Sequence, residues 1–463
     1  MIVVLFASNL LASLSQSLMN VALDDVANTF HITLSLANWM VLGYTIVTAT
    51  VIMMAAALLK RLGLRKVMML GFAFSLIGSL LGFIAWNYPV MIVARLLQAV
   101  CTGICFPLIN EALLTISPKG HAGVLLAVNS GIIGAGLAFA PPVAGLIVTY
   151  IGLHELFLVP AVMALALFVA GHFTIHDLYQ RKPGHIDISS VILSFIALAG
   201  ILYGLNELSH ELVSSLIIMI LGLVVFALFI WRQTRLKQPL LNLKPLRAPV
   251  FAVGELLVAL SYMASVYMSL LVPLYLEGAA GCTTFMAGCM CVLPILCYAI
   301  CCFPSGKILG KHGVWPLVPA GFAIVLIGYI GMYFTSAHVI VIGLLVCAAL
   351  AYAGLGIFFP SVKSVDLEVL PNEVSSDGSS IHSTIVQFGS SISSALFVGI
   401  MSGDVTRLMA SGASKASAYA SGFSHTIVIE IGILVAAVII AVIYTRLVKK
   451  FEEKSSKDSK SES

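Results

Sequence analysis

The stretch that decides the fold reads VSSLIIMILGLVVFALFIW and covers residues 213–231. It contains no charged side chain, and Arg232 and Arg235 follow it. About twenty apolar residues in a helix, at ~1.5 Å per residue, cross the ~30 Å hydrocarbon core of a bilayer. The stretch therefore predicts a membrane-spanning helix that ends in basic residues at an aqueous interface.

Other apolar segments of similar length lie along the 463-residue chain, which makes fourteen predicted spans. The composition agrees, because 60% of the residues are hydrophobic and only 10% are charged, whereas soluble domains carry about 25% charged residues. We therefore predict an all-α membrane protein. The predicted spans cover residues 2–23, 36–59, 67–86, 89–114, 122–150, 155–175, 187–207, 213–231, 250–276, 285–306, 315–335, 338–360, 376–402 and 422–447.

The basic residues orient the chain. When the spans are threaded from a cytoplasmic N-terminus, 21 of the 24 Lys and Arg residues fall on the cytoplasmic side, Lys60 and Lys363 among them. Only Arg407 and Lys415 fall outside, and Arg95 stays within a span. Cytoplasmic loops carry the excess of Lys and Arg in membrane proteins. We therefore expect a multi-pass protein of the cell membrane with both termini in the cytoplasm.

The same composition argues against several functions. The net charge of +4 is spread over loops and forms no basic stripe for nucleic acid. The nine cysteines lie mostly in apolar segments without His at ligand spacing, so we predict no metal site. No pairing of nucleophile and base and no phosphate-binding glycine loop stands out, so we expect no cofactor and no enzyme activity. The first residues run straight into the first span, so we expect no removable signal peptide.

Two polar stretches divide the spans into groups of six, two and six. One follows the sixth span and contains the residues RKPG at 181–184, and the other covers residues 232–249. Paired six-helix bundles with a substrate site between them near mid-membrane are the plan of many secondary transporters. We predict two bundles at 1–175 and 250–448, two linker spans with their flanking loops at 176–249, and a disordered tail at 449–463.

Two loops repeat one pattern at equivalent places in the two halves. Residues 56–66 read AALLKRLGLRK, and residues 306–313 read GKILGKHG. Basic residues at a cytoplasmic turn, with a glycine that ends the helix, would explain either loop alone. Their recurrence favours an internal repeat.

The span at 89–114 carries a charged side chain in an apolar environment. Arg95 is followed one helical turn later, on the same face, by Gln98. An arginine within a span is costly unless it faces a cavity or a partner. We therefore predict that Arg95 and Gln98 belong to a functional cavity. The alternative is that Arg95 extends to the outer interface or binds backbone carbonyls.

The span at 122–150 is rich in glycine and contains two adjacent prolines. Pro141 and Pro142 remove amide donors from the middle of the helix and predict a bend. The bend could be a hinge or a packing accommodation. Small residues permit close approach of a neighbouring helix, and the ones that we single out are Gly131, Gly136 and Gly145.

These two spans resemble the fourteen-helix drug:proton antiporter family of the major facilitator superfamily. Residues 95–99 (RLLQA) resemble the family's Arg-x-x-Gln-Gly segment, and residues 131–145 resemble its Gly-Pro-x-x-Gly-Gly segment. Residues 14–24 (LSQSLMNVALD) resemble its first-span pattern and include Ser15 and Asn20. The resemblance runs along essentially the whole chain, and lincomycin-resistance-type exporters are the nearest branch.

A loop motif belongs to the same resemblance. The family has a Gly-x-Leu-x-Asp-Arg-x-Gly loop after its second span, and Arg61, Gly63 and Arg65 lie in the corresponding loop here. The resemblance implies that this is a cytoplasmic gating loop. Lys60 replaces the aspartate of that pattern.

The resemblance implies a major facilitator fold of two six-helix bundles and two linker helices. It also implies proton-coupled export of amphipathic or cationic organic compounds by alternating access. The partners would be a small-molecule substrate, protons and the lipid bilayer, with no nucleic acid, and we expect a monomer. The alternatives are a facilitator or importer of a specific metabolite or lipid, and a non-transporting scaffold or sensor.

The chain departs from the family at a residue that takes part in proton handling there. The family's first-span aspartate is Ser15 in this sequence, and a serine does not titrate in the working range. Proton coupling would then need another buried acid. We predict that it uses Glu111 or Glu255, with Glu430 or Asp24 as the next candidates.

The predicted orientation can be tested by labelling. Single cysteines introduced at Lys182 and Arg235 should not react with membrane-impermeant thiol reagents added outside intact cells, because both positions are predicted to be cytoplasmic. A control cysteine at Lys415 should react. External labelling at Lys182 or Arg235 would overturn the orientation.

Overall fold

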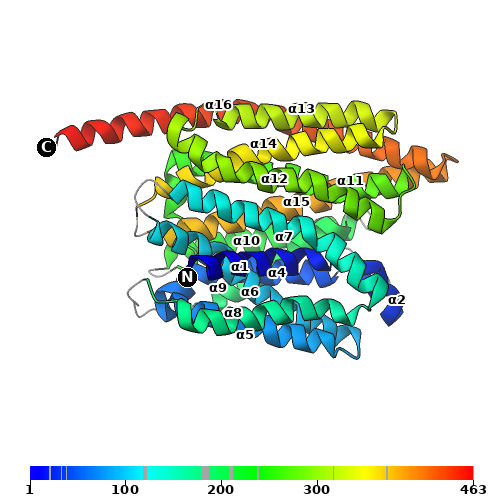
Figure 1. The fold of residues 1–463 in the computed structure, drawn as a ribbon, viewed down its shortest axis with the longest axis horizontal. Coiled ribbons are helices and arrows are strands. Elements are labelled where there is room, and N and C mark those ends of the chain that lie inside the picture. Colours follow the sequence, from blue (N-terminus) through cyan, green and yellow to red (C-terminus); the bar gives the residue numbers. More distant parts are fainter. Residues whose placement is uncertain are drawn as a thin grey trace.

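The protein, described by a computed structural model, consists of helices that lie side by side along its long axis (Figure 1). The structure describes residues 1–19, 22–32, 34–37, 39–117, 122–178, 187–207, 212–236, 239–315, 317–371 and 374–461. Within these residues every regular element is a helix. Thirteen helices are long and apolar enough to cross a membrane, and the shorter apolar helix Ile2–Leu18 brings the number to fourteen. The predicted all-α fold class is confirmed.

The first six spans pack into one half of the molecule. Local sequence sets some of their ends: the Asn87 side chain accepts a hydrogen bond of 3.0 Å from the Val90 amide and caps the helix that begins at Tyr88. The spans are α1 (Ile2–Leu18), α4 (Trp39–Leu62), α5 (Leu64–Phe83), α6 (Tyr88–Ile116), α7 (Ala122–Tyr150) and α8 (Leu158–Thr174), the last preceded by the short helix η1 (His154–Phe157).

The first span is shorter than predicted. The chain between 2 and 23 was expected to form one helix, but α1 ends at Leu18 and a separate helix, α2 (Leu23–Phe30), follows. Asp24 and Asp25 fall within α2. The acidic side chain of Asp25 in the first turn favours a helix start because it complements the positive end of the helix dipole. The short helix α3 (Leu34–Ala37) then leads into α4.

The linker spans and the second half follow along the chain. α9 packs against its neighbour α10, and also against α4 and the later helix α15. The linker spans are α9 (Ile188–Glu207) and α10 (Leu212–Arg235), joined to the second half through η2 (Lys244–Arg247). The second half contains α11 (Pro249–Gly278), α12 (Thr284–His312), α13 (Leu317–Ala337), α14 (Val341–Glu368), α15 (Ser375–Ala410) and α16 (Lys415–Ser461).

The two halves meet along two sets of helices. On one side α7 packs against α12 and α14, and on the other side α15 packs against α4 and α6. Each half also has its own apolar core: one cluster of buried side chains belongs mainly to α11–α16, and another joins the first half to the linker helices. The halves therefore meet through a few helices, which is the arrangement needed if they move relative to each other.

Several helices extend beyond their predicted ends, and α14 and α16 do so by eight residues or more. α14 continues to Glu368 although its span was predicted to stop at 360, so Lys363, predicted to lie in a cytoplasmic loop, is buried within the helix at 3% exposure. The hydropathy prediction ends at the charged residues, whereas the helix continues because these residues have partners inside the bundle: Lys363 interacts with Glu255, and Asp366 accepts a hydrogen bond from Tyr444. α16 continues to Ser461, where a disordered tail was predicted from 449; this segment contains neither proline nor glycine to end the helix.

Candidate functional site

Arg95 is buried in the first half, where three helices surround its guanidinium group. Its exposed fraction is 2%. Nη1 donates hydrogen bonds to the Ser15 carbonyl oxygen at 2.9 Å and to Gln98 Oε1 at 2.8 Å. Gln98 Nε2 in turn donates to Ser79 Oγ at 2.8 Å. The side chain therefore points into the bundle and binds a carbonyl of α1.

Among the described residues, Arg95 contacts an aromatic ring, a backbone carbonyl and Gln98, and no acid pairs with it. Its guanidinium carbon lies 4.2 Å from the centre of the Tyr44 ring on α4, a cation–π geometry. Nε and Nη2 are buried and have no hydrogen-bond partner among the described residues. Glu111, sixteen residues along α6, is about 24 Å away along the helix axis. Arg95 is thus a buried cation with two donors left for a further group.

The first-span residues lie beside Arg95 and at the boundary between the halves. Ser15 is 2% exposed, and its hydroxyl has no hydrogen-bond partner among the described residues. The neighbouring Gln16 Nε2 donates to Gln387 Oε1 of α15 at 3.4 Å, a contact between the two halves. Asn20, also singled out from the sequence, lies outside the described residues.

The second half contains a buried pair of an acid and a base. His382 Nδ1 on α15 lies 2.9 Å from Glu255 Oε1 on α11, and the two side chains are 3% and 1% exposed. Glu255 Oε2 has no hydrogen-bond partner among the described residues. Glu255 was predicted from the sequence as a coupling acid, but its histidine partner was not, because His382 lies 127 residues away in the chain.

Two charged residues of α14 complete this buried cluster. Lys363 interacts electrostatically with Glu255. Asp366 is 0% exposed, accepts a hydrogen bond of 2.7 Å from the Tyr444 hydroxyl of α16, and lies against the backbone at Gly254, where a Cβ atom would collide with it. We call Glu255, His382, Lys363, Asp366 and Tyr444 the C-half cluster. Sequence reasoning missed Lys363 and Asp366, although their three-residue spacing places them on one face of a helix.

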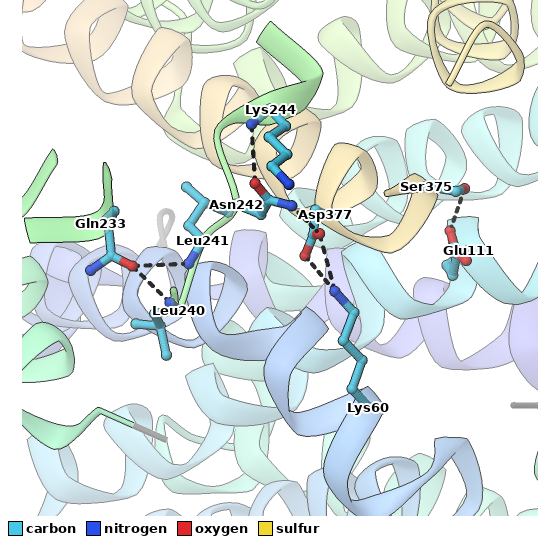
Figure 2. A network of polar contacts seen from close by, with 9 residues as sticks. All are labelled: Lys60, Glu111, Gln233, Leu240, Leu241, Asn242, Lys244, Ser375 and Asp377. Atoms are coloured by element: carbon cyan, nitrogen blue, oxygen red, sulfur yellow. Dashed lines mark hydrogen bonds and ion pairs between the residues drawn. The ribbon is translucent and has the colours of Figure 1, made fainter. Parts of the chain in front are cut away.

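A second polar site joins the halves at the predicted cytoplasmic end. Lys60 Nζ, at the end of α4, lies 2.9 Å and 3.0 Å from Asp377 Oδ1 and Oδ2, at the start of α15 (Figure 2). Asn242 Nδ2, from the segment before η2, donates to Asp377 Oδ2 at 3.1 Å. The Lys60 side chain is 44% exposed and that of Asp377 only 4%. We call Lys60, Asp377 and Asn242 the latch.

Glu111 takes part in a neighbouring contact between the halves. Ser375 Oγ, two residues before Asp377 on α15, donates to Glu111 Oε2 of α6 at 2.7 Å (Figure 2). Glu111 is 4% exposed. Of the two coupling acids predicted from the sequence, Glu111 therefore lies at the contact between the halves and Glu255 lies within the second half.

Gly63 and Arg65 of the predicted gating loop lie against the end of α8 and the residues that follow it. Gly63 has a φ of 81°, and a Cβ atom there would lie 2.6 Å from Asp177 Oδ1, so a glycine is required. The Arg65 amide donates to Asp177 Oδ1 at 3.0 Å, and Arg65 Nη2 donates to the His172 carbonyl oxygen at 2.6 Å. Arg61 is exposed. The residue of this loop that reaches the second half is Lys60.

The glycine-rich helix α7 packs against helices of both halves. A Cβ at Gly131 would lie 3.0 Å from the Ala299 carbonyl oxygen of α12, and one at Gly145 would lie 3.2 Å from Phe285 of the same helix. Gly136 faces Ser13 of α1. Pro141 and Pro142 lie inside α7, which runs from Ala122 to Tyr150 without a break. The small residues therefore permit the close approach between the halves on this side.

Glu430 and an open cavity lie elsewhere in the second half. Glu430 is 0% exposed, and neither carboxylate oxygen has a hydrogen-bond partner among the described residues. A cavity of about 750 Å³ lies between the ends of α13, α15 and α16, lined in part by Asp404, Arg407 and His425. Because these three helices belong to one half, this cavity is not the predicted substrate site between the halves.

Comparison with known proteins places this fold in a family. Residues 5–394 match the sequence family described as the Major Facilitator Superfamily. This stretch covers most of the chain, so the protein belongs to that family. The protein is a membrane transporter of the major facilitator type, and it is not an enzyme.

The relatives of this chain include lincomycin resistance proteins and a riboflavin transporter. The chain is 26% identical over 411 residues to the lincomycin resistance protein LmrB of Bacillus subtilis (strain 168), which covers 86% of this chain and 84% of that protein. It is 24% identical over 397 residues to the riboflavin transporter RibZ of Clostridioides difficile (strain 630), with 86% of each chain covered. Lincomycin resistance and multidrug proteins are among the relatives, as predicted.

Solved structures share the fold at low identity. The proton:xylose symporter XylE bound to 6-bromo-6-deoxy-D-glucose matches with a TM-score of 0.64 and 12% identity over 93% of each chain. The human organic anion transporter MFSD10 matches with a TM-score of 0.63 and 12% identity over 94% of this chain and 98% of that chain. The predicted major facilitator fold is confirmed.

Replacement of Arg95 tests the first-half site. Arg95→Ala should reduce transport at least about tenfold, a loss of ~1.4 kcal/mol, because it removes a buried cation that holds α1 and α4 together. Arg95→Lys should retain part of the activity, since the charge survives without the planar fork. Uptake or efflux is measured in vesicles at equal protein levels. Wild-type transport by the Ala variant would show that the charge has no part in function.

Charge exchange tests the latch. Lys60→Asp and Asp377→Lys should each destabilise contact between the halves, because each leaves two like charges facing each other. The double exchange should recover part of the loss, with a coupling energy of about 1 kcal/mol. Thermal stability of the purified variants gives the double-mutant cycle. Strictly additive effects would mean that the pair contributes nothing.

Proposed function

We propose that the protein exports amphipathic or cationic organic compounds in exchange for protons, by alternating access between its two halves. The observation that carries this proposal is the buried Glu255–His382 pair, an acid and a base 2.9 Å apart with almost no exposed surface. Ionisable groups within membrane spans mark proton and substrate pathways. The family's first-span aspartate is Ser15 here, so a proton site elsewhere is needed.

The C-half cluster suits a group that gains and loses a proton. When two protons are shared among the acids Glu255 and Asp366 and the bases Lys363 and His382, the net charge of the four groups is zero, whichever of them hold the protons. Loss of one proton leaves the cluster with a net charge of −1, and gain of a proton on either acid leaves it at +1. A net charge in a low-dielectric interior is costly, so each proton exchange favours a conformation that admits water to the cluster. Proton binding is thereby linked to the conformation of the second half.

The contacts between the halves support the alternating-access part of the proposal. Lys60–Asp377 and Glu111–Ser375 join α4 and α6 to α15 at the predicted cytoplasmic end. These contacts must separate when that end opens. The proposal places the structure in a state closed at the predicted cytoplasmic end, in a monomer of the cell membrane with cytoplasmic termini.

A second function has specific support. The resemblance to the riboflavin transporter RibZ, together with Ser15 at the family's acidic position, favours transport of a specific metabolite without the usual first-span proton site. A screen of drugs and metabolites in an efflux-deficient host separates broad export from a single substrate. Tolerance to several unrelated cationic compounds supports export, and a response to one metabolite alone supports the second function.

Glutamine substitution tests the coupling site. Glu255→Gln in proteoliposomes should abolish accumulation driven by a pH gradient while substrate exchange without a gradient continues, because the amide cannot release a proton. Glu430→Gln is the comparison variant, since Glu430 is also buried but neither of its carboxylate oxygens has a hydrogen-bond partner among the described residues. Full gradient-driven transport by Glu255→Gln would overturn this assignment. If the wild-type protein ignores the gradient, the facilitator alternative is supported instead.

A further inference from the structure

The segment that joins the linker helices to the second half is held by side chains. Gln233 of α10 is 3% exposed, and its Oε1 accepts hydrogen bonds from the Leu240 and Leu241 amides at 2.7 Å and 3.3 Å (Figure 2). Its Nε2 donates to Ser190 Oγ of α9 at 2.7 Å. Leu240 and Leu241 are buried. One glutamine therefore ties both linker helices to the segment that follows them.

An ion pair also joins the ends of the two linker helices. Arg232 Nε and Nη2 donate to the two oxygens of Asp187 at 2.8 Å and 3.1 Å, and Ser190 Oγ donates to the same carboxylate at 2.7 Å. The Arg232 hydrogen bond holds the pKa of Asp187 below its usual range. The pair is therefore charged at neutral pH and keeps α9 and α10 together at this end.

The tip of the same segment reaches the latch. Asn242 uses both ends of its side-chain amide: Oδ1 accepts from the Lys244 amide at 3.2 Å, and Nδ2 donates to Asp377 Oδ2 at 3.1 Å (Figure 2). Asn242 is therefore oriented by its own backbone turn before it meets Asp377. The Asp377 carboxylate therefore accepts hydrogen bonds from Lys60 of the first half and from Asn242 of the linker segment.

A segment that only connected α10 to the second half would not require these side-chain contacts. A chain segment between two helices can be joined by backbone alone, whereas here two side-chain amides fix the segment to α10 at one end and to α15 at the other. α9 also packs against both α4 and α15, the helices that carry Lys60 and Asp377. α9 thus packs against both of the helices that the latch joins.

We propose that Gln233 and Asn242 are positioning residues that make the linker helices part of the gate. Asn242 holds the Asp377 carboxylate in the orientation that Lys60 requires, and Gln233 holds Asn242 in place. Through them the linker helices stabilise the state that is closed at the predicted cytoplasmic end. The inference rests on the alternating-access part of the proposed function and gives the two additional helices of this fourteen-helix chain a role in it.

Hydrogen exchange of the full-length protein in nanodiscs tests this inference. Amides at the start of α15, from Ser375 to His382, should exchange faster when this end opens. Asn242→Ala and Gln233→Leu should each accelerate exchange there about two- to fivefold, because Asn242→Ala removes the hydrogen bond to Asp377 and Gln233→Leu releases the segment that positions it. Lys244→Ala is the matched control, because its side chain is exposed and its backbone amide still binds Asn242. It should exchange like the wild type.

A double-mutant cycle separates positioning from general loosening. Because Asn242 acts through the Lys60–Asp377 pair, Asn242→Ala should accelerate exchange less in a Lys60→Ala background than in the wild type. Equal effects in both backgrounds, or wild-type exchange in Asn242→Ala while Lys60→Ala accelerates it, would overturn the inference. The measurement needs neither substrate nor a pH gradient, so its failure is distinguishable from failure of proton-coupled transport.

Discussion

The contact on which the proposed transport cycle depends is the ion pair between Lys60 and Asp377. It joins the last turn of α4 to the first turn of α15, and the nearly buried Asp377 carboxylate has to be partnered because an unpaired charge there is costly. Ser375 and Glu111 add a hydrogen bond between the same halves. A pair that holds two bundles at one end, and that can exchange its partners for water, permits the bundles to rock without unfolding either one.

The cost of an unpaired buried charge also determines which partners the charged side chains have inside each half. A bilayer offers no water to a buried charge, so each charged side chain must find its partners within the protein. Arg95 donates hydrogen bonds to the Ser15 carbonyl oxygen and Gln98 and lies over the Tyr44 ring. Glu255 lies within hydrogen-bond distance of His382. Around Arg95 the first half therefore holds a buried cation with no acid beside it among the described residues, whereas the second half holds a group of acids and bases. In the proposed mechanism, proton exchange takes place in the second half.

Much of this could be predicted from the sequence, because hydropathy and positive charge report directly on the bilayer. The number of spans and the pairing of Arg95 with Gln98 follow from segment length and helical spacing. The C-half cluster does not, because Glu255, Lys363 and His382 come together only when α11, α14 and α15 pack. Lys363 was misplaced for a related reason: hydropathy treats every lysine as exposed, although an acid elsewhere in the fold can keep it buried. Similarly, no local signal links Lys60 to Asp377, 317 residues apart.

The distance between the halves at the predicted cytoplasmic end tests the account most directly. Nitroxide labels carried on unnatural amino acids at the exposed positions Lys66 and Lys311 report this distance by pulsed electron resonance without altering the native cysteines. The wild-type protein should show one narrow, short distance, and Asp377→Asn should add a longer one as the latch weakens. An unchanged, narrow distribution in Asp377→Asn would contradict the claim that this ion pair holds the two halves together.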